Sequence, residues 1–247
     1  MTTHFYRLLI TAMLTVSVII PSLYSPIIDR VVECLRAQTC PPLEIIVVGM
    51  DRAGRLAGRT DLHFIDTGRP ISPAAARNAG AKLACGDIYC FIDADCLAAP
   101  DWIERMVARH VQGAQVVGGG VALPRSGYWT LCDNLAVLAD FMEWSQAGER
   151  AHLPSLNFSI RRALFESLGG FDQRFTRPSG EDTDLCFRLR RQGYTLLFEP
   201  RARVTHCPPR NSFRHMWAHF HMFGATYLIL QQQNGDLIGR SLRVVLC

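Results

Sequence analysis

Short apolar runs alternate with helix-like segments along this chain, and this alternation restricts the possible folds more than any other feature. Runs rich in β-branched residues predict strands at residues 16–21, 44–48, 63–65, 88–92 and 115–121. Helical apolar spacing or alanine-rich composition predicts helices between them, at residues 26–38, 73–84 and 102–110. Strands and helices that alternate at this spacing indicate an α/β fold with a mainly parallel central sheet flanked by helices.

The second half of the chain continues the mixture of strands and helices. It predicts helices at residues 130–147, 163–168 and 181–192, and strands at residues 156–160 and 196–198. An apolar, aromatic segment at residues 212–230 predicts a long helix. No repeat or low-complexity linker interrupts the chain, so we expect one domain over residues 1–207 and a C-terminal helical tail over residues 208–247.

Composition and charge exclude several classes of protein. The 247 residues suit one large domain with a short appendage. With 49% hydrophobic and 19% charged residues, the chain is neither disordered nor a coiled coil. The formal net charge is +4, and residues 201–247 alone carry six basic residues and one acidic residue. This basic tail could face an anionic ligand or a membrane surface, or have no such role.

The N-terminus contains an uncharged stretch, residues 8–20, that raises the question of a signal peptide or anchor. Its 13 residues are too few to cross a bilayer, and it continues into strand-like sequence instead of a small-residue cleavage site. The nine cysteines form no CxxC pair, which favours reduced, buried thiols. These features predict a cytoplasmic protein.

Asp93 and Asp95 directly follow the segment expected to form the fourth strand. Ligands of open α/β sheets bind at the carboxyl ends of strands. Two neighbouring carboxylates there are unfavourable unless a cation neutralises them, and Mg²⁺ or Mn²⁺ prefers oxygen ligands shared with substrate phosphates. The pair therefore indicates a metal–diphosphate site, with a solvated turn or helix cap as the alternative.

A second acidic cluster, Glu181, Asp182 and Asp184, opens the helix expected at residues 181–192. Acidic residues in a first turn interact favourably with the helix dipole, which explains part of the cluster without any function. A carboxylate at this place could also act as a general base if an acceptor hydroxyl reaches it.

His206 lies just past the strand-like sequence that follows this helix, 24 residues after Asp182. A lone histidine is most often structural, but this one could return to the same crevice, where a neutral imidazole would be a plausible third metal ligand. His215 and His219 share a helix face but lack the glutamate of a zinc motif, which favours solvated or interfacial histidines.

Three common motifs are missing from the sequence. The glycines at residues 118–120 do not form GxGxxG, and neither GxxxxGK[ST] nor GxSxG occurs. A Rossmann dinucleotide site, a P-loop and a hydrolase nucleophile elbow are therefore unsupported.

Taken in order, these segments resemble the family 2 glycosyltransferases, which have the GT-A fold. The resemblance runs from Val16 to about His206. The matching pieces are the first strand and loop, the second strand, the helix with the DxD strand, the acceptor-side segment and the ED motif, at residues 16–25, 37–51, 74–96, 157–175 and 180–194. The QxxRW motif of processive synthases is missing, which favours transfer of one sugar per encounter.

The resemblance implies inverting transfer of a sugar from a nucleotide-diphosphate sugar, with Mg²⁺ or Mn²⁺ as cofactor. Asp93 and Asp95 would hold the metal against the diphosphate, and His206 matches a metal-binding histidine of some members. Asp182 would be the base that deprotonates the acceptor hydroxyl, and Glu181 would shape the acceptor site.

The resemblance also divides the domain into a nucleotide-binding half at about residues 14–96 and an acceptor half at about residues 97–207. The nucleotide-binding residues it implies are Pro21, Asp51, Arg77, Asn78 and Asp93.

The sequence departs from the family after the second strand, where one aspartate of an acidic pair usually reads the nucleotide base. Gly49 and Met50 stand at that place, and Asp51 follows them. The identity of the nucleotide therefore stays open, and a non-catalytic binding or scaffold subunit is an alternative. A nucleotidyltransferase is a further alternative, although residues 21–26 offer no lysine-bearing phosphate loop.

The expected partners are the nucleotide-sugar donor and a glycan, lipid or small-molecule acceptor in cell-envelope glycan or glycolipid synthesis. Nothing in the sequence points to a nucleic acid. Residues 212–230 could contact the cytoplasmic face of a membrane, or could simply cover the acceptor side of the core.

Overall fold

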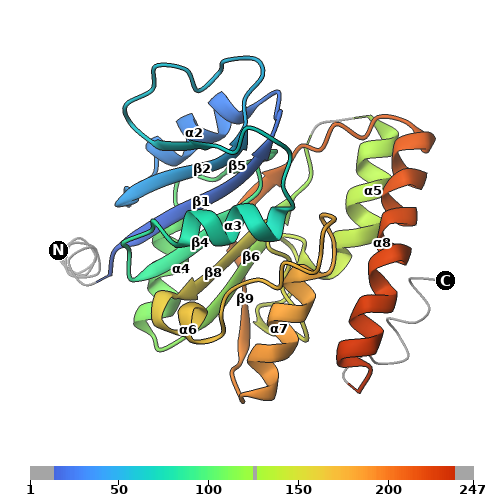
Figure 1. Cartoon of the computed structure of the whole chain (residues 1–247). Coiled ribbons are helices and arrows are strands. Elements are labelled where there is room, and N and C mark those ends of the chain that lie inside the picture. The colour runs from blue at the N-terminus through green and yellow to red at the C-terminus, as the bar shows by residue number, and fades with distance from the viewer. Residues whose placement is uncertain (1–13, 125–126, 237–247) are drawn as a thin grey trace.

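A mixed sheet with helices on both faces forms the centre of the molecule (Figure 1), as seen in a computed structural model that describes residues 14–124 and 127–236. The strands within these residues are β1 (Val16–Leu23), β2 (Glu44–Met50), β3 (His63–Asp66), β4 (Ile88–Ile92), β5 (Cys96–Ala98), β6 (Val116–Ala122), β7 (Gly148–Glu149), β8 (Asn157–Arg161) and β9 (Leu196–His206). The helices are α2 (Ile28–Arg36), α3 (Pro73–Ala81), α4 (Trp102–Val111), α5 (Tyr128–Leu138), the 3₁₀ turn η1 (Ala139–Phe141), α6 (Arg162–Ser167), α7 (Glu181–Arg191) and α8 (Phe213–Asn234).

The strand order is β3-β2-β1-β4-β8-β6-β9-β5, with β7 paired to β9. The first four strands of this order are parallel, as the alternating sequence predicts. Beyond β4 the sheet is mixed, because β8 enters antiparallel between β4 and β6, and β5 and β7 pair antiparallel with β9. The parallel half of the sheet therefore comes from the strand–helix repeats up to β4, and the mixed half from the strands that follow β4 in the chain.

The core around the parallel strands forms because apolar strands pack against small-residue helix faces. Ile19 and Ile20 of β1 are fully buried, and α3 lies on the sheet with its alanine-rich face. Gly80 of α3 approaches Ile19 so closely that a Cβ atom on it would lie 2.6 Å from the isoleucine Cγ2. Ser72 caps α3 by accepting the Ala75 amide, which fixes where the helix begins beside the sheet edge.

Two predicted elements differ from the observed ones, and two observed strands were not predicted, all for tertiary reasons. The helix expected at residues 130–147 ends at Leu138, because Met142 bridges Val121 and the Glu143 amide donates to the Val121 carbonyl. Strand β9 continues to His206, since it is paired with β6 on one side and with β5 on the other. The short strands β5 and β7 each form by pairing with β9, and neither has an apolar periodicity that would predict a strand.

Helix α8 lies beside α5 and α7 (Figure 1). Leu230 packs with Phe175 and Phe187 in a second apolar cluster, and the Ser179 and Thr226 hydroxyls are hydrogen bonded at 2.8 Å. Within the described residues, no helix combines the length and the apolar character needed to cross a bilayer. Of the uncharged N-terminal stretch, residues 8–13 lie outside the described part of the chain.

The eight cysteines of the described residues are free thiols, as expected. Four of them are buried, whereas Cys85, which the sequence places among apolar residues, is exposed at the turn before β4.

Asn157 joins the irregular part of the sheet to the layer of helices. Its Nδ2 donates to the carbonyls of Gly120 and Ala202, both at 2.9 Å, and its Oδ1 accepts from the Trp102 indole at 2.8 Å. The side chain is fully buried beside the register shift in β6. One amide therefore satisfies backbone groups that the irregular ladder leaves free.

Replacing Asn157 with alanine leaves two carbonyls and an indole N–H unpaired in the core. Each buried unpaired group costs about 1–3 kcal/mol, so we expect the free energy of unfolding in urea to fall by about 3 kcal/mol or more. Asn211→Ala, at an exposed position, is the matched control and should change it by less than about 0.5 kcal/mol. Equal effects of the two variants would contradict this role of Asn157.

Candidate active site

A cleft of about 1040 Å³ opens where β1, β2 and β4 end at their carboxyl edge. Its walls come from the loop after β1, the N-terminal ends of α3 and α7, the segment after β4, and one side of α5 and α8. Most of the residues predicted from the sequence meet in this one cavity, namely Pro21, Arg77, Asp93, Asp95, Glu181, Asp182 and His206.

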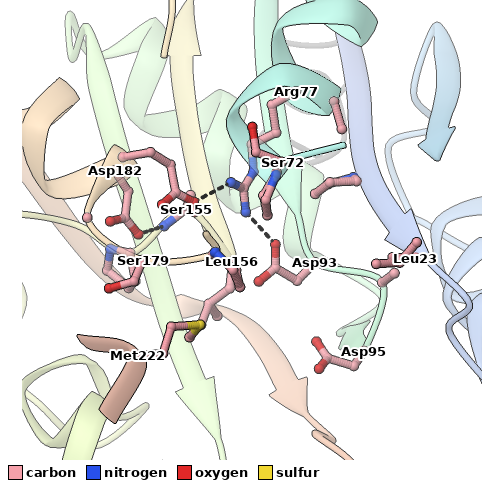
Figure 2. Close-up of a pocket in the computed structure, with 18 of the residues that line it drawn as sticks. Leu23, Ser72, Arg77, Asp93, Asp95, Ser155, Leu156, Ser179, Asp182 and Met222 are labelled. Atoms are coloured by element: carbon pink, nitrogen blue, oxygen red, sulfur yellow. Dashed lines mark hydrogen bonds and ion pairs between the residues drawn. The ribbon is translucent and has the colours of Figure 1, made fainter. Parts of the chain in front are cut away.

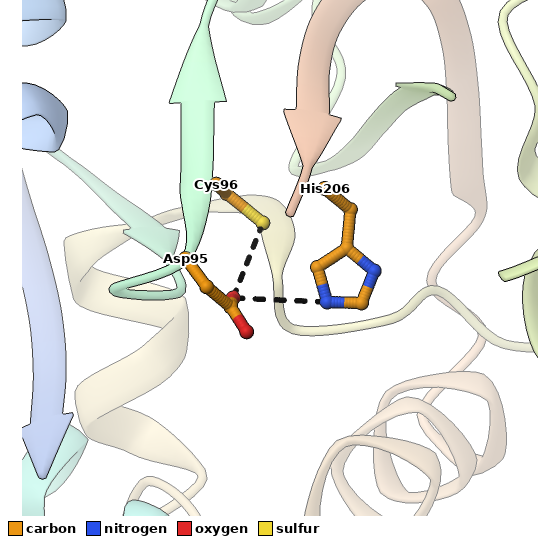
Figure 3. A group of neighbouring side chains, drawn as sticks. All are labelled: Asp95, Cys96 and His206. Atoms are coloured by element: carbon orange, nitrogen blue, oxygen red, sulfur yellow. Dashed lines mark hydrogen bonds and ion pairs between the residues drawn. The ribbon is translucent and has the colours of Figure 1, made fainter. Parts of the chain in front are cut away.

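Pairing of β5 with β9 brings Asp95 next to His206. Cys96 lies opposite His206 in this ladder, and the Cys207 amide donates to the Asp95 carbonyl at 2.8 Å. The His206 Nε2 atom lies 3.7 Å from Asp95 Oδ1 (Figure 3). Although burial by itself raises the pKa of Asp95, His206 and Arg210 hold that pKa below its usual range. Asp95 therefore presents a carboxylate to the cleft beside an imidazole nitrogen.

Asn134 of α5 determines which nitrogen of His206 faces Asp95. The Nδ1 atom of His206 lies 2.5 Å from the Asn134 Oδ1, and the Asn134 Nδ2 donates to the His206 carbonyl at 3.3 Å. Because an amide oxygen only accepts, Nδ1 carries a proton, which makes Nε2 the nitrogen that can bind a cation when the ring is neutral. A carboxylate beside an available imidazole nitrogen is a donor set that fits a divalent cation, and the contact from Asn134 orients the ligand.

Cys96 completes the group of potential ligand atoms that lie within 4.8 Å of one another, together with Asp95 and His206 (Figure 3). Its thiol does not line the cleft, and burial together with the carboxylates of Asp95 and Asp93 raises the thiol pKa well above its usual range. A neutral, enclosed thiol is a poor ligand for Mg²⁺ or Mn²⁺. The part of this group that faces the cleft is therefore Asp95 and His206.

Asp93 is not part of this group, although the sequence predicts it as a metal ligand. Its Oδ1 accepts from Arg77 Nη2 at 2.7 Å, and Figure 2 shows it turned toward the guanidinium and away from Asp95. The Arg77 guanidinium thus gives Asp93 a partner of opposite charge that does not require a metal ion.

Arg77 bridges the two acidic clusters of the cleft (Figure 2). Besides Asp93, its Nη1 donates to Glu181 Oε1 at 2.8 Å, and its guanidinium lies 5.4 Å above the Phe171 ring. Its side chain is only 3% exposed. Burial opposes the charge, but the carboxylates of Asp93, Glu181 and Asp182 outweigh it and raise the Arg77 pKa. A cation so enclosed depends on its two carboxylate partners.

Glu181, the first residue of α7, is buried at the other end of this bridge from Asp93. Burial and the neighbouring Asp182 raise its pKa to about 7, against the lowering effect of Arg77. Its Oε2 atom has no hydrogen-bond partner among the described residues. Glu181 therefore anchors Arg77 with one oxygen and leaves the other unpaired.

Asp182 lies beside Glu181 at the N-terminus of α7 and points to the same space (Figure 2). Its Oδ2 accepts from the Ser155 amide at 3.0 Å, and its Oδ1 accepts from the Thr183 amide at 2.8 Å. Gly180, in the left-handed region at φ 87°, turns the chain into the helix just before this pair. The backbone amides and the helix dipole hold the Asp182 carboxylate in place at the cleft wall.

Gly49 lies near the end of β2, at the place where family 2 glycosyltransferases usually have an acidic pair. Its φ is +145°, and a Cβ atom there would lie 1.8 Å from the Ser22 carbonyl oxygen. Asp51, just beyond β2, turns away from the cleft and accepts the Leu56 amide at 2.6 Å. The far end of the cavity is lined instead by Pro21, Ser22, Leu23, Val48, Gly49 and Thr67.

Asn78 likewise does not line the cleft. Its side chain exchanges two hydrogen bonds with the backbone of Phe171, donating at 2.7 Å and accepting at 2.9 Å. It positions the ring that packs on Arg77, so its contribution to the site is indirect.

Asp133, Arg210 and His219 form a cluster on the cleft wall that sequence reasoning missed. Asp133 is 1% exposed, and it accepts from Arg210 at 2.9 Å and pairs with His219 Nδ1 at 2.8 Å. Burial alone raises the pKa of Asp133, but these two partners lower it overall. His215 contacts Asn211 instead, so the two histidines of this helix face have different partners.

Comparison with known proteins identifies the family to which the chain belongs. The model of the family described as glycosyl transferase family 2 matches residues 17–168. A glucosyl-dolichyl phosphate glucuronosyltransferase from Haloferax volcanii is 31% identical over 72% of this chain and 63% of its own length. A pre-mycofactocin glycosyltransferase from Mycobacterium tuberculosis is 30% identical over 59% of this chain and 32% of its own. The chain thus spans less than two thirds of the length of these relatives.

Solved structures share the fold at low sequence identity. GalNAc-T7 with UDP, GalNAc and Mn²⁺ has a TM-score of 0.61 at 19% identity, over 78% of this chain and 44% of that one. A mannosyltransferase from Pyrobaculum calidifontis with GDP-Man and Mn²⁺ has a TM-score of 0.59 at 19% identity, over 89% of this chain and 70% of that one. The chain has the GT-A fold and belongs to glycosyl transferase family 2.

Proposed function

We propose that the protein transfers a sugar from a nucleotide-diphosphate sugar to an acceptor hydroxyl with inversion, in a reaction that depends on Mg²⁺ or Mn²⁺. The observation that carries this proposal is the shared cleft: Asp95 with His206 lies toward one end and Asp182 toward the other, and Arg77 lies between them. A donor diphosphate and an acceptor base can therefore face the same space. Both solved structures named above hold Mn²⁺ with a nucleotide or nucleotide sugar.

In the proposed complex the nucleotide occupies the end of the cleft next to Pro21 and Thr67. Asp95 and His206 would hold the cation, whose charge would stabilise the departing diphosphate. Arg210 lies close enough to lower the pKa of Asp95 and adds a positive charge on the same side. Asp93 accepts from Arg77 and holds it in place, and its assignment as a metal ligand stays a prediction.

Asp182 is the proposed general base. The acceptor oxygen attacks the anomeric carbon as the bond from that carbon to the diphosphate breaks, and the hydroxyl proton passes to the Asp182 carboxylate. Its carboxylate is held by the Ser155 and Thr183 amides, so it meets the hydroxyl in a fixed position. Glu181 holds Arg77 from the acceptor side and so shapes the space that the acceptor enters.

We also propose that residues 1–207 form the catalytic domain, with the nucleotide-binding half at about residues 14–96 and the acceptor half at about residues 97–207. Residues 208–247 form the tail, whose helix α8 supplies acceptor-side wall through Met222 and Phe223. A role in cell-envelope glycan or glycolipid synthesis fits the dolichyl phosphate-linked substrate in one relative's name. Cytoplasmic location stays a prediction.

Binding of a nucleotide panel tests the donor end of the proposal. Calorimetry with UDP, GDP, dTDP and CMP should show Mn²⁺-dependent binding of one diphosphate to the wild type. Asp95→Asn should weaken that binding by about 100-fold or more, because it removes a charged metal ligand. Asp236→Asn, at an exposed carboxylate, is the control and should bind like the wild type. Folded wild-type protein that binds no nucleotide would favour a scaffold role instead.

Asn134→Leu tests the orientation of His206. Without the amide oxygen, Nδ1 no longer has a fixed partner and the imidazole can take the wrong tautomer. We expect Mn²⁺ affinity, measured by electron paramagnetic resonance, to fall by about 10–100-fold. Asn211→Leu on the surface should leave it unchanged, and an unchanged affinity in Asn134→Leu would refute the orienting role.

Asp182→Asn separates chemistry from donor binding. The amide cannot accept the proton, so kcat should fall by about 10²–10⁴-fold. Nucleotide affinity should stay within about twofold of wild type, since Asp182 lies on the acceptor side. Retention of normal kcat in a transfer assay with excess acceptor would assign the base elsewhere.

A further inference from the structure

Four aromatic side chains form a patch at one end of the molecule. Tyr128, Trp129, Phe213 and Trp217, the aromatic patch, contact in series with ring centroids 5.1, 5.7 and 6.1 Å apart. Three of them are largely exposed: Tyr128 at 70%, Trp217 at 63% and Phe213 at 54%. Contiguous exposed apolar side chains are typical of interaction surfaces, whereas single exposed apolar residues are common on any protein.

The aromatic patch exists because the N-terminal ends of α5 and α8 lie next to each other (Figure 1). The Thr130 hydroxyl donates to the Arg210 carbonyl at 2.6 Å and joins the two ends. Along α8 the cleft receives His219, Met222 and Phe223, whereas Phe213 and Trp217 are not among the residues that line it. The aromatic patch is thus separate from the cleft, and the exposed area of its rings is not used in packing within the protein.

The size and charge of the aromatic patch indicate what it contacts. Three rings exposed to this degree offer about 300–450 Å², less than the roughly 800 Å² per partner of a stable protein interface. Indole and phenol rings instead settle at the headgroup level of membranes, where one edge stays hydrated. The helix ends that carry the rings, at residues 127–132 and 208–217, contain no acidic residue, and Arg214 is exposed among them.

We propose that the aromatic patch docks the protein on a bilayer surface that carries anionic headgroups. The rings insert at the headgroup level, Arg214 meets the negative surface, and no described helix crosses the bilayer. This narrows the membrane contact expected for residues 212–230 to the first turns of α8 and adds the start of α5. Arg210 and His219 lie both beside these turns and on the cleft wall, so docking brings that wall close to the lipid surface.

Sedimentation of the full chain with vesicles tests the proposal, using phosphatidylcholine mixed with phosphatidylglycerol and phosphatidylcholine alone. The wild type should bind the mixed vesicles more strongly than the neutral ones. Trp217→Ala should weaken binding by about tenfold, as loss of one inserted ring predicts. Trp144→Ala is the matched control, because Trp144 is 62% exposed but lies outside the aromatic patch. Arg214→Gln should reduce the preference for anionic vesicles.

Three outcomes would overturn the proposal: no binding of folded wild type to either vesicle, equal binding by Trp217→Ala and wild type, or loss of binding in Trp144→Ala to the same extent. Size-exclusion chromatography without lipid adds a fourth, because a dimer that Trp217→Ala converts to a monomer would assign the patch to a second copy. Circular dichroism confirms folding of each variant. Nucleotide binding in solution should be unchanged in Trp217→Ala, so failure of docking is distinguishable from failure of the proposed function.

Discussion

The buried ion pairs of Arg77 are the interaction on which the rest of the site depends. A guanidinium that is almost fully enclosed requires carboxylates on both sides, and these come from segments far apart in the chain, after β4 and at the start of α7. Removal of either carboxylate would leave one end of the buried guanidinium without its hydrogen-bond partner. The position of α7 is therefore coupled to the position of the segment that follows β4.

The proposed metal site and the proposed base site depend on backbone geometry in a similar way. The β5–β9 ladder sets the distance between Asp95 and His206, and the start of α7 sets the direction of Asp182. Neither place is a regular element interior; both are element ends, where free amides and carbonyls are available to hold side chains.

Local sequence was sufficient to predict the parallel half of the sheet, since strands such as β1 and β4 are buried apolar runs with clear limits. It also placed Asp95, Asp182 and His206 at the ends of elements, and the structure brings these three residues to one cleft. It could not reveal Asn134, whose role depends on a neighbour 72 residues away, nor that Asp51 turns to its own loop. Strands β5 and β7 and the early end of α5 are likewise products of tertiary pairing.

Gly49 has a consequence for any change of nucleotide preference. Its backbone passes so close to Ser22 that no side chain fits, so a carboxylate cannot be restored at this position by substitution without moving β1. In the proposed donor complex, discrimination among bases would then come from groups that already surround the cavity end, such as the Thr67 hydroxyl and the backbone of the loop after β1. Redesign of donor choice in this protein is therefore a problem of reshaping loops, because the strand itself offers no site for a new contact.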